Sequence, residues 1–326
     1  MKKVKLGLLA CGGIANKMAR AVPAAPNVEL YACAARELSR AEEFAAKYNI
    51  PKAYGSYQEM VADPEIDLIY VSTPHSHHYE AIKLCLEGGK NVICEKPFTP
   101  NAKQAEELFA LAKFKGLFLM EAMWTRFLPA IKELKKMVEG GIIGELLTAN
   151  LTSGQDLRHV PRLNDPALAG GALLDMGIYS ITFPDLFMGE DIKEIHSSAR
   201  ISDKGVDLTN VVLFDYGNGK CASVMSSCLA AYAETSSLLG TDGYIILNGF
   251  GGLTEFTVVK KDVRTTYSFP NALRGNGFEH ELMEAADCIL AGKLESDILP
   301  GRKTIHMMGL MDRIRKPWGV VYPFEK

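Results

Sequence analysis

Strand-like and helix-like segments alternate regularly along residues 1–123 of this chain. Short apolar runs predict strands, and apolar residues at every third or fourth position predict helices. The predicted strands are Val4–Ala10, Val28–Ala35, Leu68–Thr73, Asn91–Cys94 and Leu117–Met123. The predicted helices are Ile14–Val22, Ala41–Tyr48, His78–Glu87 and Ala102–Lys113. This alternation predicts an α/β fold, a doubly wound parallel sheet of the Rossmann type that binds a nucleotide.

The pattern changes after this region, and residues 124–326 predict a second domain that binds the substrate. Several predicted strands follow one another there without intervening helices, which indicates a mostly antiparallel sheet. These strands are Leu208–Asp215, Lys220–Cys228, Glu234–Leu239 and Tyr244–Asn248, the first two joined by the turn Tyr-Gly-Asn-Gly. The predicted helices of this domain are Pro129–Glu139, Ala172–Met188, Gly277–Leu290 and Arg302–Arg315.

Composition is that of an ordinary enzyme-sized protein. The chain has 326 residues, 48% hydrophobic and 23% charged. This length favours two domains. A net charge of −3 gives no indication of nucleic acid or of an acidic membrane surface. No apolar run is long enough to span a bilayer. The seven cysteines lack the paired spacing of metal ligands and are expected to be reduced, which favours a cytoplasmic location.

The first fifteen residues, MKKVKLGLLACGGIA, allow two interpretations. Two lysines before Leu-Ala-Cys-Gly resemble a bacterial lipoprotein signal with Cys11 as the lipidated residue. Such a signal needs an uninterrupted apolar core, and Lys5 leaves only Leu6–Ala10. A buried strand that runs into a glycine turn needs only a short apolar run, and we favour this interpretation.

The glycine turn is a candidate site for the pyrophosphate of a dinucleotide. Its residues Cys11, Gly12, Gly13 and Ile14 precede a helix whose N-terminus favours an anion. The motif is imperfect because Ala10 occupies the position of the first glycine in the usual G-x-G-x-x-G/A pattern. Alone it equally fits an ordinary strand-turn-helix.

Two arginines follow the second predicted strand and bear on the choice of cofactor. An NAD-binding domain usually has Asp or Glu there to bind the ribose 2′-hydroxyl. Here the strand ends in Arg36, with Arg40 one helical turn later. Guanidinium groups suit a 2′-phosphate, so we expect NADP rather than NAD. The alternative is a solvated basic helix start, which the nearby Glu37 supports.

Two further clusters follow predicted strands and are therefore expected at the carboxyl edge of the sheet, where such folds bind ligands. They are Ser72-Thr-Pro-His-Ser-His-His78 and Cys94-Glu-Lys-Pro97. From them we predict contacts with the cofactor by Thr73, Pro74, His75, His78, Glu95 and Lys96. No fitting carboxylate or cysteine pair follows the histidines, and we predict no metal.

Glu95-Lys-Pro97, together with Gly170-Gly-Ala-Leu-Leu-Asp-Met-Gly-Ile-Tyr179, resembles the glucose-fructose oxidoreductase and inositol dehydrogenase family, often called Gfo/Idh/MocA. The dimeric dihydrodiol dehydrogenases, also NADP-dependent D-xylose dehydrogenases, are the most similar subgroup. Segments similar to that subgroup are Ala35-Arg-Glu-Leu-Ser-Arg-Ala-Glu-Glu-Phe44, Pro51–Tyr57, Met120–Phe127 and Leu173–Tyr179. The resemblance implies an open, mostly antiparallel C-terminal sheet, often used for a homodimer.

The resemblance also assigns roles to three residues. Lys96 matches the catalytic lysine, Asp175 the carboxylate of the helical motif, and Tyr179 the proton-transfer position. Asp175 and Tyr179 are four residues apart, so a helix presents both on one face. A phenol has an ordinary pKa of about 10, and a nearby ammonium stabilises its anion. Each residue alone has a simpler structural explanation, but their joint order and spacing favour these roles.

The predicted reaction is hydride transfer between a carbinol carbon and the nicotinamide of NADP. Its substrate is a small sugar, polyol or cyclic diol. Trp124, Arg126 and Phe278 are expected to form the floor and walls of the substrate pocket, and Trp124 and Arg126 also to lie near the cofactor. Two alternatives remain open: a non-catalytic sensor that binds NADP and a sugar, and an NAD-linked inositol or aminosugar dehydrogenase. If Tyr179 is not the base, His78 or a bound water is the next candidate.

Overall fold

The computed structural model describes residues 2–231 and 235–325. The chain forms two compact units. The first comprises Met1–Phe127 and Leu273–Met308, and the second comprises Leu128–Ala272 and Gly309–Lys326. This division differs from the predicted domains 1–123 and 124–326, because residues 273–308 pack with the first unit.

The first unit is built on a six-stranded sheet with the order β3-β2-β1-β4-β5-β6. All neighbouring strands in it are parallel, which confirms the predicted Rossmann fold. The strands are β1 (Val4–Leu9), β2 (Val28–Ala34), β3 (Lys52–Tyr54), β4 (Leu68–Val71), β5 (Asn91–Glu95) and β6 (Leu119–Ala122). The short β3, which lies at the edge of the sheet, was not predicted.

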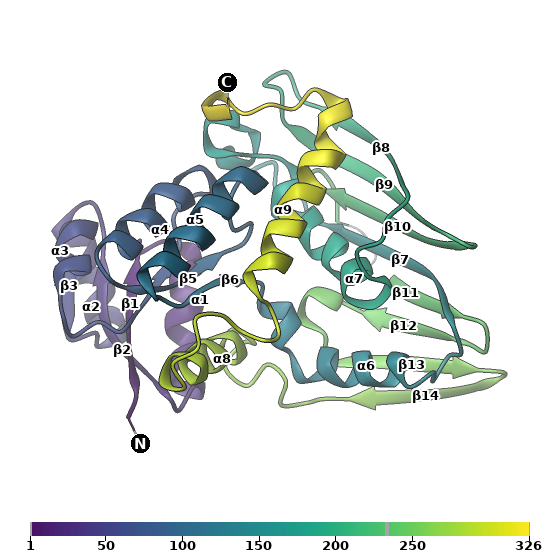
Figure 1. Ribbon diagram of the computed structural model, residues 1–326, viewed down its shortest axis with the longest axis horizontal. Coiled ribbons are helices and arrows are strands. Elements are labelled where there is room, and N and C mark those ends of the chain that lie inside the picture. Colours follow the sequence, from purple (N-terminus) through teal and green to yellow (C-terminus); the bar gives the residue numbers. More distant parts are fainter. Residues whose placement is uncertain (1, 232–234, 326) are drawn as a thin grey trace. The chain divides into compact units, whose positions relative to one another are not determined.

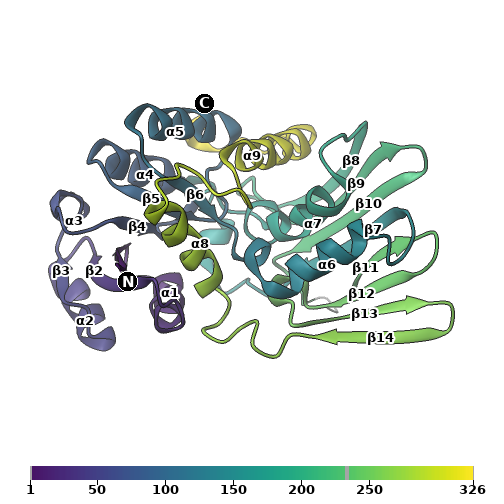
Figure 2. The same ribbon diagram turned by 60° about the horizontal axis from the view of Figure 1, so that its bottom comes forward.

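Helices connect these strands (Figure 1). They are α1 (Gly13–Ala21), α2 (Leu38–Tyr48), α3 (Tyr57–Ala62), α4 (His78–Glu87) and α5 (Ala102–Lys115). Helix α8 (Glu279–Leu290) comes from far along the chain and packs against β1 and β2 (Figures 1 and 2). The amide of Asn27, which precedes β2, donates to the Met283 carbonyl and the Asp287 carboxylate of α8 at 3.0 and 2.7 Å. These contacts explain why residues 273–308 belong to the first unit.

The second unit is built on an eight-stranded sheet with the order β14-β13-β12-β11-β7-β10-β9-β8. Only the β7–β10 pair is parallel, so the predicted mostly antiparallel sheet is confirmed. The strands are β7 (Leu146–Gly154), β8 (Glu194–Ile201), β9 (Asp207–Gly217), β10 (Lys220–Ser227), β11 (Thr235–Gly240), β12 (Tyr244–Asn248), β13 (Glu255–Lys260) and β14 (Val263–Ser268). Four of these strands, β7, β8, β13 and β14, were not predicted. Glu234, the predicted start of one strand, lies outside the described residues.

Helices α6 (Pro129–Glu139) and α7 (Ile178–Met188) pack on this sheet and against each other (Figure 2). Residues alternate along β9, so that Val212 and Phe214 are buried whereas Val211 and Leu213 are about two-fifths exposed. One face of the sheet is therefore covered, and the other presents apolar side chains to solvent. Helix α9 (Gly301–Arg315) begins in the first unit and ends in the second.

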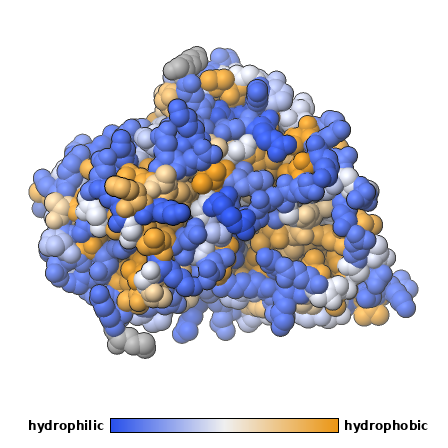
Figure 3. All heavy atoms as spheres, viewed as in Figure 1, coloured by the Kyte–Doolittle hydropathy of each residue, from blue (hydrophilic) through white to orange (hydrophobic). Residues whose placement is uncertain are grey.

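The side of the protein drawn in Figure 3 is mostly hydrophilic, with apolar side chains in smaller patches. Scattered apolar groups are normal on the surface of a folded protein. No helix in residues 2–231 and 235–325 combines the length and the apolar character that crossing a membrane requires.

The core of the first unit contains a carboxyl group, that of Glu121 in β6, which is 2% exposed. Its oxygens accept hydrogen bonds from the Phe98 amide and the Thr304 hydroxyl, both at 3.1 Å. Burial raises the pKa of Glu121 to about 7, although these hydrogen bonds oppose the shift. Burial also raises the pKa of the neighbouring Glu95 and Glu281 carboxyls. The Glu121 carboxyl therefore retains its proton up to a higher pH in the folded protein than in the unfolded chain.

Replacement of Glu121 with Gln should flatten the pH dependence of stability. A carboxyl whose pKa is raised on folding, here from 4.5 to about 7, stabilises the fold below the lower value and loses this contribution as pH rises through the upper one. Near pH 6 the slopes of unfolding free energy against pH should differ by up to about 1.4 kcal/mol per pH unit. Chemical denaturation at several pH values measures this, with the exposed Glu106→Gln as control. Identical slopes for E121Q and the original protein would show that Glu121 is ionised in the fold.

Candidate active site

The turn between β1 and α1 has the geometry expected of a dinucleotide-binding turn. Ala10 adopts φ +78°, a conformation that favours glycine, at the position where the usual motif has one. Gly12 precedes α1 in an extended conformation, and no side chain caps the helix. A Cβ added at Gly12 or Gly13 would meet no atom within 4 Å. Cys11 and Ile14 flank this open turn and are partly exposed. An anion could therefore approach the first amides of α1.

Arg36 and Arg40 lie just beyond the carboxyl end of β2, and both are exposed. Their charges act on the phenol of Tyr57, the first residue of α3, which also lies near Cys11. Burial raises the pKa of Tyr57, and the two guanidinium groups oppose that shift. The structure thus gathers two cations and an aromatic ring beside the glycine turn.

The loop after β4 is fixed to the glycine turn by Ser72. Its hydroxyl lies 3.0 Å from the carbonyl oxygens of both Leu9 and Ala10, to which it can donate. Thr73 is 9% exposed, and its hydroxyl oxygen is buried without a hydrogen-bond partner among the described residues. A buried hydroxyl without a partner is costly, so Thr73 offers a bonding position to a ligand at this edge.

The histidines predicted to contact the cofactor are mostly buried. His75 is 6% exposed, in a 3-10 turn (His75–His77) that Pro74 precedes. His78 is fully buried, with Nδ1 2.9 Å from the Pro97 carbonyl and Nε2 2.8 Å from the Thr73 carbonyl. Burial lowers the pKa of His78 to about 4. A carbonyl oxygen lies within hydrogen-bond distance of each ring nitrogen, so His78 links two loops. It is therefore poorly placed to act as a base.

Lys96 follows directly on β5 and is partly exposed. Its backbone amide donates to the Glu95 carboxylate at 3.1 Å. That carboxylate is 6% exposed and also accepts a hydrogen bond from the Tyr70 hydroxyl. Glu95 is therefore buried, whereas Lys96, just beyond the carboxyl end of β5, is partly exposed.

Trp124 and Phe278 come together although they are far apart in sequence. Their rings stack with centroids 5.1 Å apart and an interplanar angle of 13°. Gly277 precedes this stack with φ +97°, and a Cβ there would lie 2.6 Å from the Trp124 ring. Glycine is thus required for the close approach. Arg126, in the same 3-10 turn as Trp124, is 5% exposed, and its charge acts on the Glu121 carboxyl.

In the second unit, Asp175 and Tyr179 lie where two helical forms meet. The predicted helix over Ala172–Met188 is in fact a π-helical turn (Leu173–Gly177) followed by α7. The Ile178 amide donates to the Leu173 carbonyl, five residues back. Asp175 belongs to the π-turn and is 5% exposed, whereas Tyr179 in α7 is partly exposed. Turns of this kind occur often at functional sites.

Asp175 has a cationic partner that the sequence did not reveal. Arg162 donates from its guanidinium to an Asp175 carboxylate oxygen at 3.1 Å. The Asp175 side chain is 8% exposed and that of Arg162 is 39% exposed. Arg162 lies in a 3-10 turn (Pro161–Asn164), where no periodic pattern in the sequence singles it out. The ion pair restricts the orientation of the Asp175 carboxylate.

A buried aspartate fixes the start of the π-turn. Asp207, at the first position of β9, is 1% exposed and accepts hydrogen bonds from the Leu173 amide and the Asn210 side chain, both at 2.8 Å. Burial raises the pKa of Asp207 to about 6 against the effect of these bonds. Gly171, with φ +122°, lies so close that a Cβ would be 2.4 Å from an Asp207 carboxylate oxygen. Both the aspartate and the glycine therefore determine where Asp175 lies.

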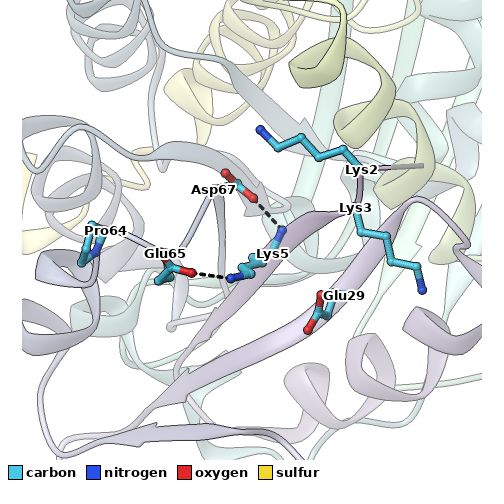
Figure 4. A pocket seen from close by; sticks show the side chains of 7 residues that line it. All are labelled: Lys2, Lys3, Lys5, Glu29, Pro64, Glu65 and Asp67. Atoms are coloured by element: carbon cyan, nitrogen blue, oxygen red, sulfur yellow. Dashed lines mark hydrogen bonds and ion pairs between the residues drawn. The ribbon is translucent and has the colours of Figure 1, made fainter.

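A different hollow, of about 520 Å³, lies at the amino end of β1 (Figure 4). Lys5 Nζ lies 2.5 Å from Glu65, and the Lys5 amide donates to Asp67 at 2.9 Å. Lys5 thus pairs with Glu65 through its side chain and with Asp67 through its backbone amide. The hollow lies at the opposite end of β1 from the glycine turn. Within the described residues, no group of three or more His, Cys, Asp or Glu side chains could hold a metal ion.

Comparison with known proteins identifies the family. Residues 4–123 match the model of the Gfo/Idh/MocA oxidoreductase family with an NAD-binding Rossmann fold, and residues 131–246 match its C-terminal domain. The chain belongs to the Gfo/Idh/MocA family. It is 37% identical to the mouse and human trans-1,2-dihydrobenzene-1,2-diol dehydrogenases, with 99% of each chain covered. The 3-ketoreductase of Actinomadura kijaniata, crystallised with NADP and TDP-benzene, has a TM-score of 0.88, 26% identity and 97% and 98% coverage.

This membership makes the chain an NAD(P)-dependent oxidoreductase and confirms the family resemblance seen in the sequence. The first unit fits such a cofactor. It has open space above Gly12 and Gly13, and among residues 2–231 and 235–325 no side chain caps the start of α1 or bonds the Thr73 hydroxyl. In this Gfo/Idh/MocA protein, Arg36, Arg40 and Tyr57 add a cationic and aromatic group beside that space.

Replacement of Gly171 with Ala should destabilise this protein more than the same change at Gly205. Gly205 also has positive φ, +90°, but an added Cβ there meets no atom within 4 Å. The control should cost about 1 to 2 kcal/mol through backbone conformation alone. At Gly171 the carboxylate of Asp207 must also move, which weakens its bond to Leu173 and should add at least about 1 kcal/mol. Denaturant titration measures both, and equal losses would show that Asp207 adapts freely.

Proposed function

We propose that this protein is an NADP-dependent dehydrogenase of small cyclic diols or sugars, in which residues 1–123 bind the dinucleotide and residues 124–326 bind the substrate and a second copy of the chain. As a family member it is an NAD(P)-dependent dehydrogenase acting on CH–OH groups. The observation that most favours NADP is the pair Arg36 and Arg40, with Tyr57, beyond β2. Two guanidinium groups can bind a 2′-phosphate in the place where an NAD enzyme has a carboxylate.

The proposed chemistry assigns one role to each of three side chains. When bound, the nicotinamide supplies the hydride acceptor or donor. Tyr179 exchanges a proton with the substrate hydroxyl, and Lys96 supplies a positive charge that favours the phenolate. Asp175, held by Arg162, orients the proton-transfer group. The partly exposed positions of Lys96 and Tyr179 support these roles, because reacting groups must meet the substrate.

The proposed substrate follows from the stacked rings and from the relatives. Trp124 and Phe278 form a flat apolar surface, which suits one face of a six-membered ring. The mammalian relatives are named for a cyclic diol, trans-1,2-dihydrobenzene-1,2-diol, and the structural relative is a 3-ketoreductase crystallised with NADP and TDP-benzene. A cyclic diol or a pyranose combines such a face with an edge of hydroxyl groups.

We further propose a cytoplasmic homodimer, or a higher homo-oligomer, formed through the open face of the second sheet. The exposed side chains of Val211 and Leu213 on β9 support this, because a contact there would remove apolar surface from water. All seven cysteines are free thiols, which favours a reducing compartment.

Replacement of Arg36 with Ala should weaken NADP binding by about 1 to 3 kcal/mol and leave NAD binding nearly unchanged. The reason is that only NADP carries the 2′-phosphate that the guanidinium would bind. Calorimetric titration with each cofactor measures both affinities. Arg20→Ala, which changes an exposed arginine at the end of α1, is a matched control that should affect neither. Equal losses for NADP and NAD in R36A would favour the NAD-linked inositol or aminosugar dehydrogenase.

Replacement of Tyr179 with Phe should lower kcat by at least about 10²-fold while cofactor affinity stays the same. Phe keeps the packing of the ring and removes only the hydroxyl. Tyr244→Phe, a change at an exposed position of β12, is the control and should retain full activity. A Y179F enzyme with most of its activity would make a bound water the base. If no aldose, polyol or cyclic diol is turned over with either cofactor, a non-catalytic sensor becomes the better description.

Replacement of Lys96 with Met should reduce the rate and move its pH profile to higher pH. A phenol without a cationic neighbour ionises only in more alkaline solution. The pH dependence of kcat/KM, measured for K96M and the original enzyme, tests this assignment. A lower rate with an unchanged profile would limit Lys96 to binding.

A further inference from the structure

Asn16, the fourth residue of α1, forms two hydrogen bonds with the glycine turn. Its side-chain amide donates to the Gly12 carbonyl at 2.8 Å, and its backbone amide donates to the same oxygen at 3.2 Å. The backbone bond is an ordinary bond of the helix and already gives this carbonyl a partner. The side-chain bond is therefore an additional restraint on the peptide group that joins Gly12 and Gly13.

Two residues at the end of α2 restrain the side chain of Asn16 in turn. The Tyr48 hydroxyl and the Lys47 ammonium donate to the Asn16 side-chain oxygen at 2.7 and 2.8 Å. An ammonium group can only donate, so the amide oxygen faces Lys47 and the amide nitrogen faces Gly12. The Tyr48 ring packs on Phe44 of the same helix, with centroids 4.9 Å apart. Asn16 thus connects the end of α2 to the turn before α1.

The turn needs this restraint because it contains two successive glycines. Glycine lacks a Cβ, and its backbone has more conformational freedom than that of any other residue. A Cβ added at Gly12 or Gly13 would meet no atom of the described residues within 4 Å, so close packing does not restrain their peptide group. Ser72 holds the turn on its strand side. Asn16 holds it on its helix side.

The orientation of this peptide group decides which donor a ligand meets. In a trans peptide the N–H and C=O groups point in opposite directions. The Gly12 carbonyl faces Asn16 within the helix, so the Gly13 N–H points out of the helix start. The first N–H groups of a helix are donors that bind phosphate oxygens. A fixed Gly12 carbonyl therefore keeps the Gly13 donor directed toward the open space at the turn.

We propose that Asn16 is a positioning residue for dinucleotide binding, which holds the Gly12–Gly13 peptide so that the Gly13 N–H meets the pyrophosphate. This inference rests on the proposed function, in which the pyrophosphate lies over the glycine turn. Because the peptide is oriented before the ligand arrives, binding loses less conformational entropy. The pyrophosphate is common to NADP and NAD, so Asn16 serves both cofactors, whereas Arg36 concerns the 2′-phosphate alone.

The test compares Asn16→Leu with the original full-length protein by calorimetric titration with NADP, NAD and 2′-AMP. Leu is similar in size to Asn but can neither donate to Gly12 nor accept from Tyr48. We expect the affinities for NADP and NAD to fall by the same factor, about tenfold, the equivalent of one hydrogen bond. The affinity for 2′-AMP, which has the 2′-phosphate and no pyrophosphate, should stay nearly unchanged.

Asn27→Leu is the matched control for this variant. The Asn27 amide also joins two elements of the first unit, but it lies before β2 and bonds α8. Its loss should lower stability and leave the affinity for each cofactor unchanged. A variant that folds less completely shows fewer binding sites per molecule at the same affinity. The titration therefore separates a loss of folded protein from a loss of positioning.

Tyr48→Phe is a milder second test, which decides the matter if Asn16→Leu does not fold. It removes one donor to the Asn16 oxygen and leaves the amide bond to Gly12 in place. We expect the affinities for NADP and NAD to fall together by about two- to threefold. Tyr79→Phe is its control and should change neither, because the Tyr79 hydroxyl donates to Glu107, also at 2.7 Å, between α4 and α5.

The outcomes separate the inference from the function on which it rests. If the original protein binds NADP and NAD, and Asn16→Leu binds both as tightly, the inference is wrong and the proposed function stands. An equal loss of affinity for 2′-AMP would also overturn the inference, because Asn16 would then act on the whole binding site. If the original protein binds neither dinucleotide, the proposed function fails and the inference fails with it.

Discussion

The backbone hydrogen bonding of the six-stranded parallel sheet determines where chemistry can occur in the first unit. Its central strands are buried, as the four consecutive buried residues of β4 illustrate. Polar backbone groups in such strands are satisfied by neighbouring strands, so groups able to bind a ligand collect where strands end. The glycine turn, Thr73 and Lys96 all follow strands at this one edge. These groups lie together because the sheet topology brings the ends of several parallel strands to one edge.

The second unit positions its polar residues by a different constraint, a carboxylate without access to water. Asp207 must find donors because it is buried, and it finds them in the Leu173 amide and the Asn210 side chain. These bonds fix the chain just before Asp175. Arg162, which precedes Asp175 by 13 residues in the sequence, pairs with the Asp175 carboxylate. One buried acid therefore helps to set the position of another.

The sequence predicts the first unit better than the second for a physical reason. Strands buried on both faces appear as continuous apolar runs, so β1, β2 and β4 were found within two residues of their ends. Strands with one exposed face carry mixed residues, and β8, none of whose residues is buried, was missed. Lys96, Asp175 and Tyr179 could be selected by motif, whereas Tyr57, Arg162 and Asp207 could not, because only tertiary contacts give them partners.

The contribution of residues 273–308 to the first unit has a consequence for how the protein is made. A ribosome releases the chain from its N-terminus, and domains commonly fold as they emerge. Here β1 and β2 lack their cover, α8, and Trp124 lacks Phe278 until the whole of residues 128–272 has been synthesised. Most of the second unit, residues 128–272, is inserted in the sequence between the two segments of the first unit. The nascent nucleotide-binding sheet therefore has apolar surface exposed until residues 273–308 have been synthesised.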